Sequence, residues 1–158
     1  MADQLEQFGN QSNAAPHQDA RWNLVVPGTS DSLPQIRDLV IHITRCIHFD
    51  EEMSGKIEMA VDEACANIVE HAYRDQKPPG EIELRAQAFS DRLEISILDH
   101  AHNDFPVDSK PYMGIDEYIS SERRRGMGLF IIHSFMDDVR HRYVAGHGNE
   151  LLLVKYIA

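Results

Sequence analysis

Apolar residues recur at helical spacing in two consecutive stretches of the chain, residues 29–47 and 52–74. The first stretch has Asp31 or Ser32 available as a cap and Pro34 in its first turn. The apolar stripes are Ile36, Leu39, Val40, Ile43 and Ile47 in the first stretch, and Ile57, Val61, Ala64, Cys65, Ile68 and Ala72 in the second. These stripes predict two amphipathic helices that pack on a common core.

Alternation of apolar and polar residues predicts the strands. The predicted strands are residues 22–26, 81–88, 92–97, about 139–144 and 151–157. A third helix is predicted at residues 126–136, and a turn at residues 145–149 joins the last two strands. The order strand, helix, helix, hairpin, helix, hairpin predicts an α/β (α+β) two-layer sandwich, with the helices on one face of a mostly antiparallel sheet.

Length and composition indicate one folded domain. The chain has 158 residues, of which 42% are hydrophobic, enough for one core. Residues 1–20 are polar and aperiodic, so we expect a flexible N-terminal tail followed by a single domain at residues 21–158.

Charge and cysteine content narrow the function classes. The net charge of −11 at pH 7 repels nucleic acid phosphates, so no direct nucleic acid binding is expected. No apolar run approaches 18 residues and the N-terminus does not resemble a signal peptide, so no membrane association is expected. Cys46 and Cys65 both fall in helical patterns and are interpreted as small buried residues of a reducing compartment. Together these features predict a cytoplasmic protein.

The first candidate site is Glu63 with Asn67, which are four residues apart and share one face of the second predicted helix. A carboxylate base beside an amide oxygen could serve proton transfer and magnesium binding. An ordinary solvated helix face is the alternative interpretation, and it is the better one if the pair is taken alone.

Two further candidates lie downstream. Asp99 ends an alternating strand, where its carboxylate could accept a hydrogen bond from an adenine amino group or simply terminate the strand. Residues 100–125 are long, polar and weakly periodic, which is typical of a functional loop. The loop ends in a basic and glycine-containing run that opens the third helix, where backbone amides and arginines can bind phosphate. This run is Arg123, Arg124, Arg125, Gly126, Met127 and Gly128.

Three segments together resemble a known family. DEACANIVEHAY at residues 62–73 is similar to the N-box of the GHKL ATPases, especially the version in RsbW-type anti-sigma-factor serine/threonine kinases. ERRRGMGLFIIHSFMDDV at residues 122–139 resembles the second glycine box of these kinases, and GHGNELLLVK at residues 146–155 resembles their terminal strand. The likeness spans about residues 22–158, with the segments in the order and spacing of the family.

The resemblance implies a Bergerat-type fold that holds ATP and Mg²⁺ between a mostly antiparallel mixed sheet, three helices and a mobile lid. It implies Glu63 as the general base, Asn67 as the magnesium ligand and Asp99 as the adenine-recognising residue. Gly126 and Gly128 would cradle phosphates around Met127. The lid arginines Arg123, Arg124 and Arg125 would be candidate contacts of the γ-phosphate, with no choice among the three.

One position departs from the family pattern. The first glycine box usually reads Asp-x-Gly, whereas this chain has Asp99, His100 and Ala101. Ala101 adds a methyl group to the nucleotide-binding region and removes the backbone freedom of glycine. A lower nucleotide affinity than in relatives is therefore expected.

The resemblance implies an anti-sigma factor that phosphorylates an anti-anti-sigma (STAS-type) antagonist on serine or threonine in a partner-switching pathway. The implied partners are this antagonist and a sigma factor, and the sequence leaves a homodimer open. Two alternatives stay open as well: a nucleotide-binding sequestration module without kinase activity, which Ala101 favours weakly, and a kinase that regulates a partner other than a sigma factor.

Overall fold

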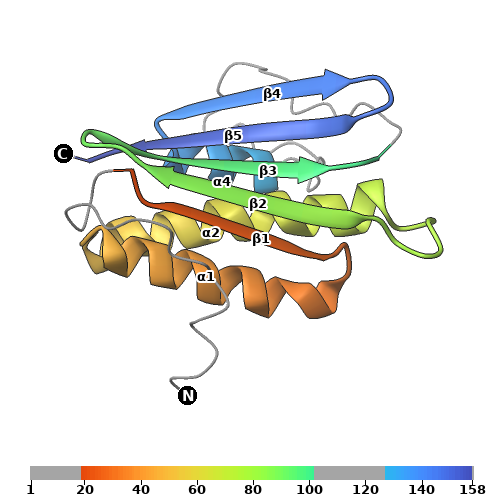
Figure 1. Ribbon diagram of the computed structural model, residues 1–158, viewed down its shortest axis with the longest axis horizontal. Coiled ribbons are helices and arrows are strands. Elements are labelled where there is room, and N and C mark those ends of the chain that lie inside the picture. Colours follow the sequence, from red (N-terminus) through yellow and green to blue (C-terminus); the bar gives the residue numbers. More distant parts are fainter. Residues whose placement is uncertain (1–18, 102–126, 158) are drawn as a thin grey trace.

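The computed structural model describes residues 19–101 and 127–157 and forms two layers (Figure 1). The strands are β1 (Arg21–Pro27), β2 (Glu81–Ala88), β3 (Arg92–Asp99), β4 (Asp138–Val144) and β5 (Gly148–Tyr156). They form one sheet in the order β1-β2-β3-β5-β4. The helices α1 (Leu33–Cys46), α2 (Glu51–Asn67) and α4 (Met127–Phe135) lie on one face of this sheet. The predicted two-layer α/β sandwich is confirmed, although every strand pair in the described residues is antiparallel rather than mixed.

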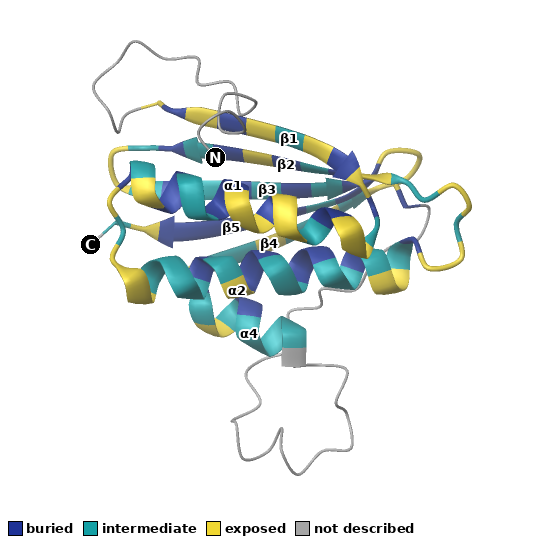
Figure 2. Ribbon diagram, turned by 90° about the horizontal axis from the view of Figure 1, so that it is seen from below, coloured by how far each residue is buried: buried dark blue, intermediate teal, exposed yellow. Residues whose placement is uncertain are grey.

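The core lies between the helices and the covered face of the sheet (Figure 2). Alternate residues of β2 and β3 point into it, as the period of two predicts. The predicted stripe of α1 is buried throughout, and that of α2 is buried except for Ala72, which is half-buried. Trp22 of β1 is also buried in this core, 4% exposed. The periodicity of the sequence therefore identified the core-facing side of α1, α2, β2 and β3.

The first helix begins differently from the prediction. A 3-10 turn, η2 (Ser30–Ser32), contains Asp31 and precedes α1. Ser32 is the residue before α1, but its side chain makes no capping hydrogen bond. The predicted side-chain cap by Asp31 or Ser32 is wrong, because Asp31 lies within the 3-10 turn through which the chain enters the helix and Ser32 makes no capping hydrogen bond. Pro34 lies in the first turn of α1, as predicted.

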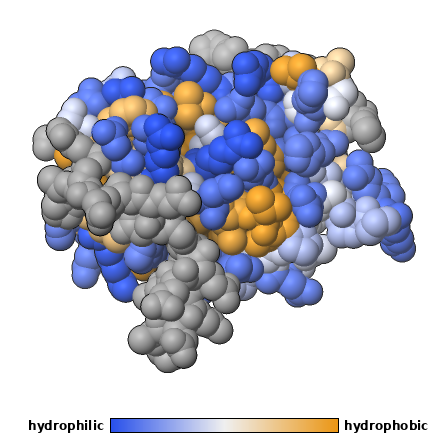
Figure 3. Space-filling model, viewed as in Figure 1, coloured by the Kyte–Doolittle hydropathy of each residue, from blue (hydrophilic) through white to orange (hydrophobic). Residues whose placement is uncertain are grey.

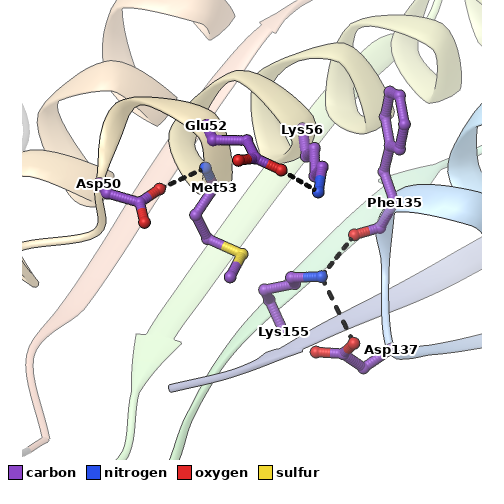
Figure 4. Close-up of polar contacts among 7 residues, drawn as sticks. All are labelled: Asp50, Glu52, Met53, Lys56, Phe135, Asp137 and Lys155. Atoms are coloured by element: carbon purple, nitrogen blue, oxygen red, sulfur yellow. Dashed lines mark hydrogen bonds and ion pairs between the residues drawn. The ribbon is translucent and has the colours of Figure 1, made fainter. Parts of the chain in front are cut away.

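Helix α2 has a side-chain cap at its start and an unusual continuation at its end. Asp50 accepts a hydrogen bond of 2.7 Å from the backbone amide of Met53 (Figure 4). After Asn67 the chain continues as a π-helix, η3 (Ile68–Ala72). The wider turns of a π-helix are frequent at functional sites. Here the π-helix follows directly on the segment that carries Glu63 and Asn67.

Tyr73, the residue after η3, joins three segments. Its ring lies against Gly28 and Gly80, and a Cβ atom at either glycine would overlap it. Its hydroxyl donates to the carbonyl oxygen of Glu81 at 2.8 Å and accepts from the backbone amide of His100 at 2.8 Å. Tyr73 therefore ties the end of η3 to the start of β2 and to the end of β3.

The other end of the helical layer is held by Lys155 of β5. Its ammonium donates to the carbonyl oxygen of Phe135 at 2.8 Å and lies 3.4 Å from Oδ1 of Asp137 (Figure 4). Oδ2 of Asp137 in turn accepts from the backbone amide of Tyr156 at 2.7 Å. These contacts fix the C-terminal end of α4 to the sheet.

The outer surface is largely polar. On the face seen in Figure 3, hydrophilic residues predominate and hydrophobic ones gather in a few patches. The exposed large hydrophobic residues come from four different elements: Val25, Met59, Val144 and Tyr156. Among the described residues, no helix has the length and apolar character needed to span a bilayer.

Candidate functional site

Glu63 and Asn67 lie together at the seam between α2 and α4. Both are half-buried. A Cβ atom built on Gly128 would lie 2.8 Å from Oε2 of Glu63 and 3.3 Å from Nδ2 of Asn67. The solvated-face alternative is therefore wrong for this pair, because the second residue of α4 packs directly on both side chains.

This seam has hydrogen-bond donors suited to phosphate and oxygen atoms suited to a metal ion bound to that phosphate. The start of α4 presents backbone amides that attract anions, and Gly128 carries no side chain to block the approach. The Glu63 carboxylate and the Asn67 amide oxygen are hard oxygen donors of the type that Mg²⁺ prefers. The residues present therefore fit a site where a magnesium-bound phosphate meets a carboxylate.

Asp99 lies at the end of β3 and is only 3% exposed. Its Oδ1 accepts from the backbone amide of Ala101 at 2.9 Å, from Nδ2 of Asn149 at 3.1 Å and from the backbone amide of Asn149 at 3.4 Å. An ionised carboxylate can only accept hydrogen bonds, so these donors match it. The buried carboxylate is thus held in one orientation by β5 and by the turn that follows β3.

The departure at Ala101 is accommodated locally. Ala101 is 3% exposed, and its backbone amide closes a turn onto Asp99. The close approach at this point is made instead by Gly148, whose φ is +104° and whose Cα faces the backbone of Asp99 and His100. A Cβ atom at Gly148 would overlap that backbone, so glycine is required in β5 at this position.

A small pocket connects the two halves of the site. Its volume is about 20 Å³, room for about one water molecule. The lining residues are Ala64, Asn67, Ile68, Ile97, Asp99, Leu129, Ile132, His141, Asn149 and Leu151. This space among the described side chains is much smaller than a purine ring.

Two polar residues of this pocket were not among the sequence candidates. Asn149 was assigned to the predicted turn 145–149, but β5 begins at Gly148 and places Asn149 on the inward face, 6% exposed. His141 of β4 lies close to it, with Nε2 2.8 Å from Oδ1 of Asn149. Extending the inward alternation of Leu151 and Leu153 back by one step would have identified Asn149.

The basic and glycine-containing run is only partly covered by the described residues. Arg123, Arg124, Arg125 and Gly126 lie outside them, so their predicted phosphate contacts stay predictions. Met127 contributes the first backbone position of α4, and its side chain also lies outside the described set. Of this run, Gly128 alone is brought to Glu63 and Asn67 by the described structure.

The cysteines do not supply a reactive thiolate. Burial raises the pKa of Cys65 to about 12 and also raises the pKa of Cys46. Cys65 is fully buried as predicted, whereas Cys46 is half-buried, with Sγ 3.5 Å from Nε2 of His42. Both thiols therefore stay protonated at neutral pH, which disfavours nucleophilic thiol chemistry.

Comparison with known proteins places this geometry in a family. The histidine kinase-like ATPase domain matches residues 26–155. Among curated proteins, the serine-protein kinase RsbW of Bacillus mycoides (strain KBAB4) is 30% identical over 136 residues, which cover 84% of this chain and 82% of the relative. RsbW of Bacillus subtilis (strain 168) is 35% identical over 107 residues, covering 64% and 63%.

Solved structures agree on the fold. The RsbU and RsbW domains of a Mycobacterium tuberculosis protein superpose with a TM-score of 0.60 at 18% identity, over 85% of this chain and 31% of that one. A blue-light activated histidine kinase from Erythrobacter litoralis superposes with a TM-score of 0.53 at 18% identity, over 82% and 42%. The chain belongs to the histidine kinase-like ATPase family and, within it, to the RsbW-type protein serine/threonine kinases.

Proposed function

We propose that the protein transfers the γ-phosphate of ATP to a serine or threonine of an anti-anti-sigma (STAS-type) antagonist, and that it sequesters a sigma factor when the antagonist is phosphorylated. Its place of action is the cytoplasm, where both partners of such a pathway reside. The observation that carries the proposal is the packing of Gly128 against Glu63 and Asn67, which joins a helix N-terminus, a carboxylate and an amide in one seam.

The chemistry assigned to this seam is a direct phosphoryl transfer. The substrate hydroxyl oxygen forms a bond to the γ-phosphorus, the bond to the β,γ-bridging oxygen breaks, and ADP leaves. Glu63 takes the hydroxyl proton, a role that needs a carboxylate within reach of the substrate. Bound Mg²⁺, with Asn67 as its protein ligand, supplies positive charge against the phosphate oxygens.

The remaining candidates complete the nucleotide site. Asp99 accepts a hydrogen bond from the adenine amino group, at the pocket that it shares with Asn67. The backbone around Ala101, Gly126, Met127 and Gly128 lines the phosphate path. One or more of Arg123, Arg124 and Arg125 neutralise the γ-phosphate, because guanidinium groups pair well with phosphate oxygens.

Partner switching requires that phosphorylation change an affinity. Unmodified antagonist captures this protein and releases the sigma factor, and phosphorylated antagonist dissociates. A ligand shifts such an equilibrium only by its differential affinity for the two states. The phosphate group, with a charge of about −1.5 to −2, supplies that difference through repulsion by a protein whose own net charge is −11.

The test is the Glu63→Gln variant. Gln keeps the size and polarity of Glu63 but cannot accept the proton, so phosphorylation of a purified STAS-type antagonist should fall by about 10²–10⁴-fold. ATP affinity, measured by calorimetry on the same preparation, should stay within about threefold, because a general base acts mainly on the transition state. Glu58→Gln on the same helix is the matched control and should leave both quantities unchanged.

The outcomes separate the candidate functions. If the Glu63→Gln variant phosphorylated the antagonist at the parental rate, Glu63 would not be the general base. A parent protein that binds ATP and sequesters a sigma factor, yet phosphorylates no STAS-type antagonist, would establish the sequestration module that Ala101 weakly favours. If the protein instead phosphorylated a different class of protein, it would be a kinase that regulates a partner other than a sigma factor.

A further inference from the structure

Three buried or half-buried polar side chains form a chain of hydrogen bonds across the sheet, and two of them have no role in the function proposed above. Nε2 of His141 lies 2.8 Å from Oδ1 of Asn149, and Nδ2 of Asn149 lies 3.1 Å from Oδ1 of Asp99. The residues come from β4, β5 and β3, which are adjacent in the sheet. All three line the same pocket.

The direction of this chain is set by Asp99. An ionised carboxylate accepts only, so the Asn149 amide must turn its NH₂ group towards Asp99 and its oxygen towards His141. The Asn149 oxygen in turn requires a donor, so Nε2 of His141 carries a proton. His141 therefore holds the oxygen of the Asn149 amide, while Asp99 holds its nitrogen.

As a result, the two carboxylate oxygens of Asp99 differ in the hydrogen bonds that they accept. Oδ1 receives Nδ2 and the backbone amide of Asn149 as well as the amide of Ala101. Within residues 19–101 and 127–157, no group donates to Oδ2. A carboxylate held in this way presents one oriented acceptor, which pairs with an exocyclic amino group and repels a carbonyl oxygen.

We propose that His141 is a positioning residue for base selection: acting through Asn149, it holds Asp99 as an acceptor and thereby makes the site prefer 6-amino purines over 6-oxo purines. This inference rests on the proposed binding of ATP at Asp99 and adds the residue that enforces the choice of base. Without the donor at His141, the buried oxygen of Asn149 loses this hydrogen bond, and the amide is held less firmly in its orientation. Asp99 then keeps its two backbone donors but is held less firmly by the Asn149 side chain, and this looser hold makes a 6-oxo base more acceptable.

The experiment compares ATP with inosine triphosphate, which differs at the 6-position, on the full chain by calorimetry. In His141→Phe, which keeps a planar ring but has no donor, ATP affinity should fall about tenfold. Affinity for inosine triphosphate should change less than about threefold, so the ratio of the ATP affinity to the inosine triphosphate affinity should fall. His141→Gln, whose amide can donate to Asn149, should restore most of the preference. Because the preference is a ratio measured on one preparation, a partly misfolded fraction does not alter it.

A matched control and a double-mutant cycle make the result specific. His147→Phe changes an exposed histidine in the turn between β4 and β5 and should leave the preference intact. In an Asn149→Ala background, His141→Phe should have no further effect, because His141 acts through Asn149. A persistent effect there would mean that His141 contacts the nucleotide directly, and the proposal would be overturned.

The remaining outcomes are also distinct. A parent that binds ATP but shows the same ratio of affinities after His141→Phe would refute the positioning role and leave the proposed kinase function standing. A parent that binds neither nucleotide would refute the proposed function together with this inference.

Discussion

The absence of a side chain at Gly128 affects where the Glu63 carboxylate can lie in the candidate site. Any side chain there would push on Oε2 of Glu63, which is the far end of a flexible side chain. The protein can relieve such a clash by moving Glu63 at little cost in stability. Glycine at this point therefore matters more for the position of the Glu63 carboxylate than for the packing of α4.

Gly128→Ala should consequently separate activity from stability. Moving the Glu63 carboxylate should lower the phosphorylation rate by at least about tenfold, because a displaced base loses much of its contribution. The free energy of unfolding should change by less than about 1 kcal/mol, since alanine favours the helix by about that amount. A phosphorylation time course and urea denaturation check the two parts.

Gly55→Ala is the control for this substitution. Gly55 lies inside α2, and a Cβ atom there would meet nothing within 4 Å. This variant should gain up to about 1 kcal/mol of stability and keep full activity. If Gly128→Ala were as active as Gly55→Ala, the close contact with Glu63 would have no part in the reaction.

At the scale of single elements, helix α4 is held to the sheet at its last turn. Lys155 bonds to the carbonyl oxygen of Phe135, one of the groups that a helix end leaves without an intrahelical partner. Lys155 is only 8% exposed. The strand β5 therefore holds the C-terminal end of the helix whose N-terminal end meets Glu63.

Lys155→Met should destabilise the protein by about 1–3 kcal/mol, because it removes the donor to the Phe135 carbonyl and the ammonium beside Oδ1 of Asp137. The midpoint of urea denaturation measures this loss. Lys56→Met is the control: Lys56 pairs with Glu52 on the surface of α2 (Figure 4), and its loss should leave the midpoint unchanged. Equal midpoints for the two variants would contradict the structural role of Lys155.

The elements themselves were largely predictable, because periodicity reports which face of a helix or strand is buried. The stripe from Ile36 to Ile47 and the alternation from Ile82 to Ile97 both identified the core correctly. The prediction began this strand at residue 151, whereas β5 begins at Gly148, because the prediction followed apolar residues only. A strand that turns a polar residue inward, as β5 does at Asn149 and Lys155, gives no apolar signal and is cut short.

The site was predictable in part for the same reason. Glu63 and Asn67 were identified by their spacing, but spacing on one helix cannot distinguish a solvated face from a seam with another helix. That distinction needed α4, which is distant in the sequence. His141 and Asp99 are likewise far apart along the chain, and only the antiparallel pairing of β3, β5 and β4 brings them to one pocket.

At the scale of the whole molecule, nucleotide binding should be visible as a gain in stability. A ligand that binds only the folded state at about 100 times its Kd adds about 2.7 kcal/mol, or roughly 5–10 °C in melting temperature for a domain of this size. ATP with Mg²⁺ should produce this gain in thermal unfolding. Chelation of the metal with EDTA should remove most of it, because the phosphates then lose their link to Asn67.

The same melting experiment on Asp99→Asn checks that the gain arises at the assigned site. The amide presents a donor where an acceptor is needed, so the ATP-dependent shift should shrink. A melting temperature that ignores ATP in the parent protein at every concentration would contradict nucleotide binding as a whole.

The burial of Trp22 has a spectroscopic consequence. It is the only tryptophan of the chain, and it lies in β1, at the opposite edge of the sheet from β4. Its fluorescence should therefore shift to longer wavelength when the core is exposed to water, yet stay constant while nucleotide enters the pocket among β3, β5 and β4. The protein thus carries an intrinsic probe that reports global unfolding separately from ligand occupancy, without any added label.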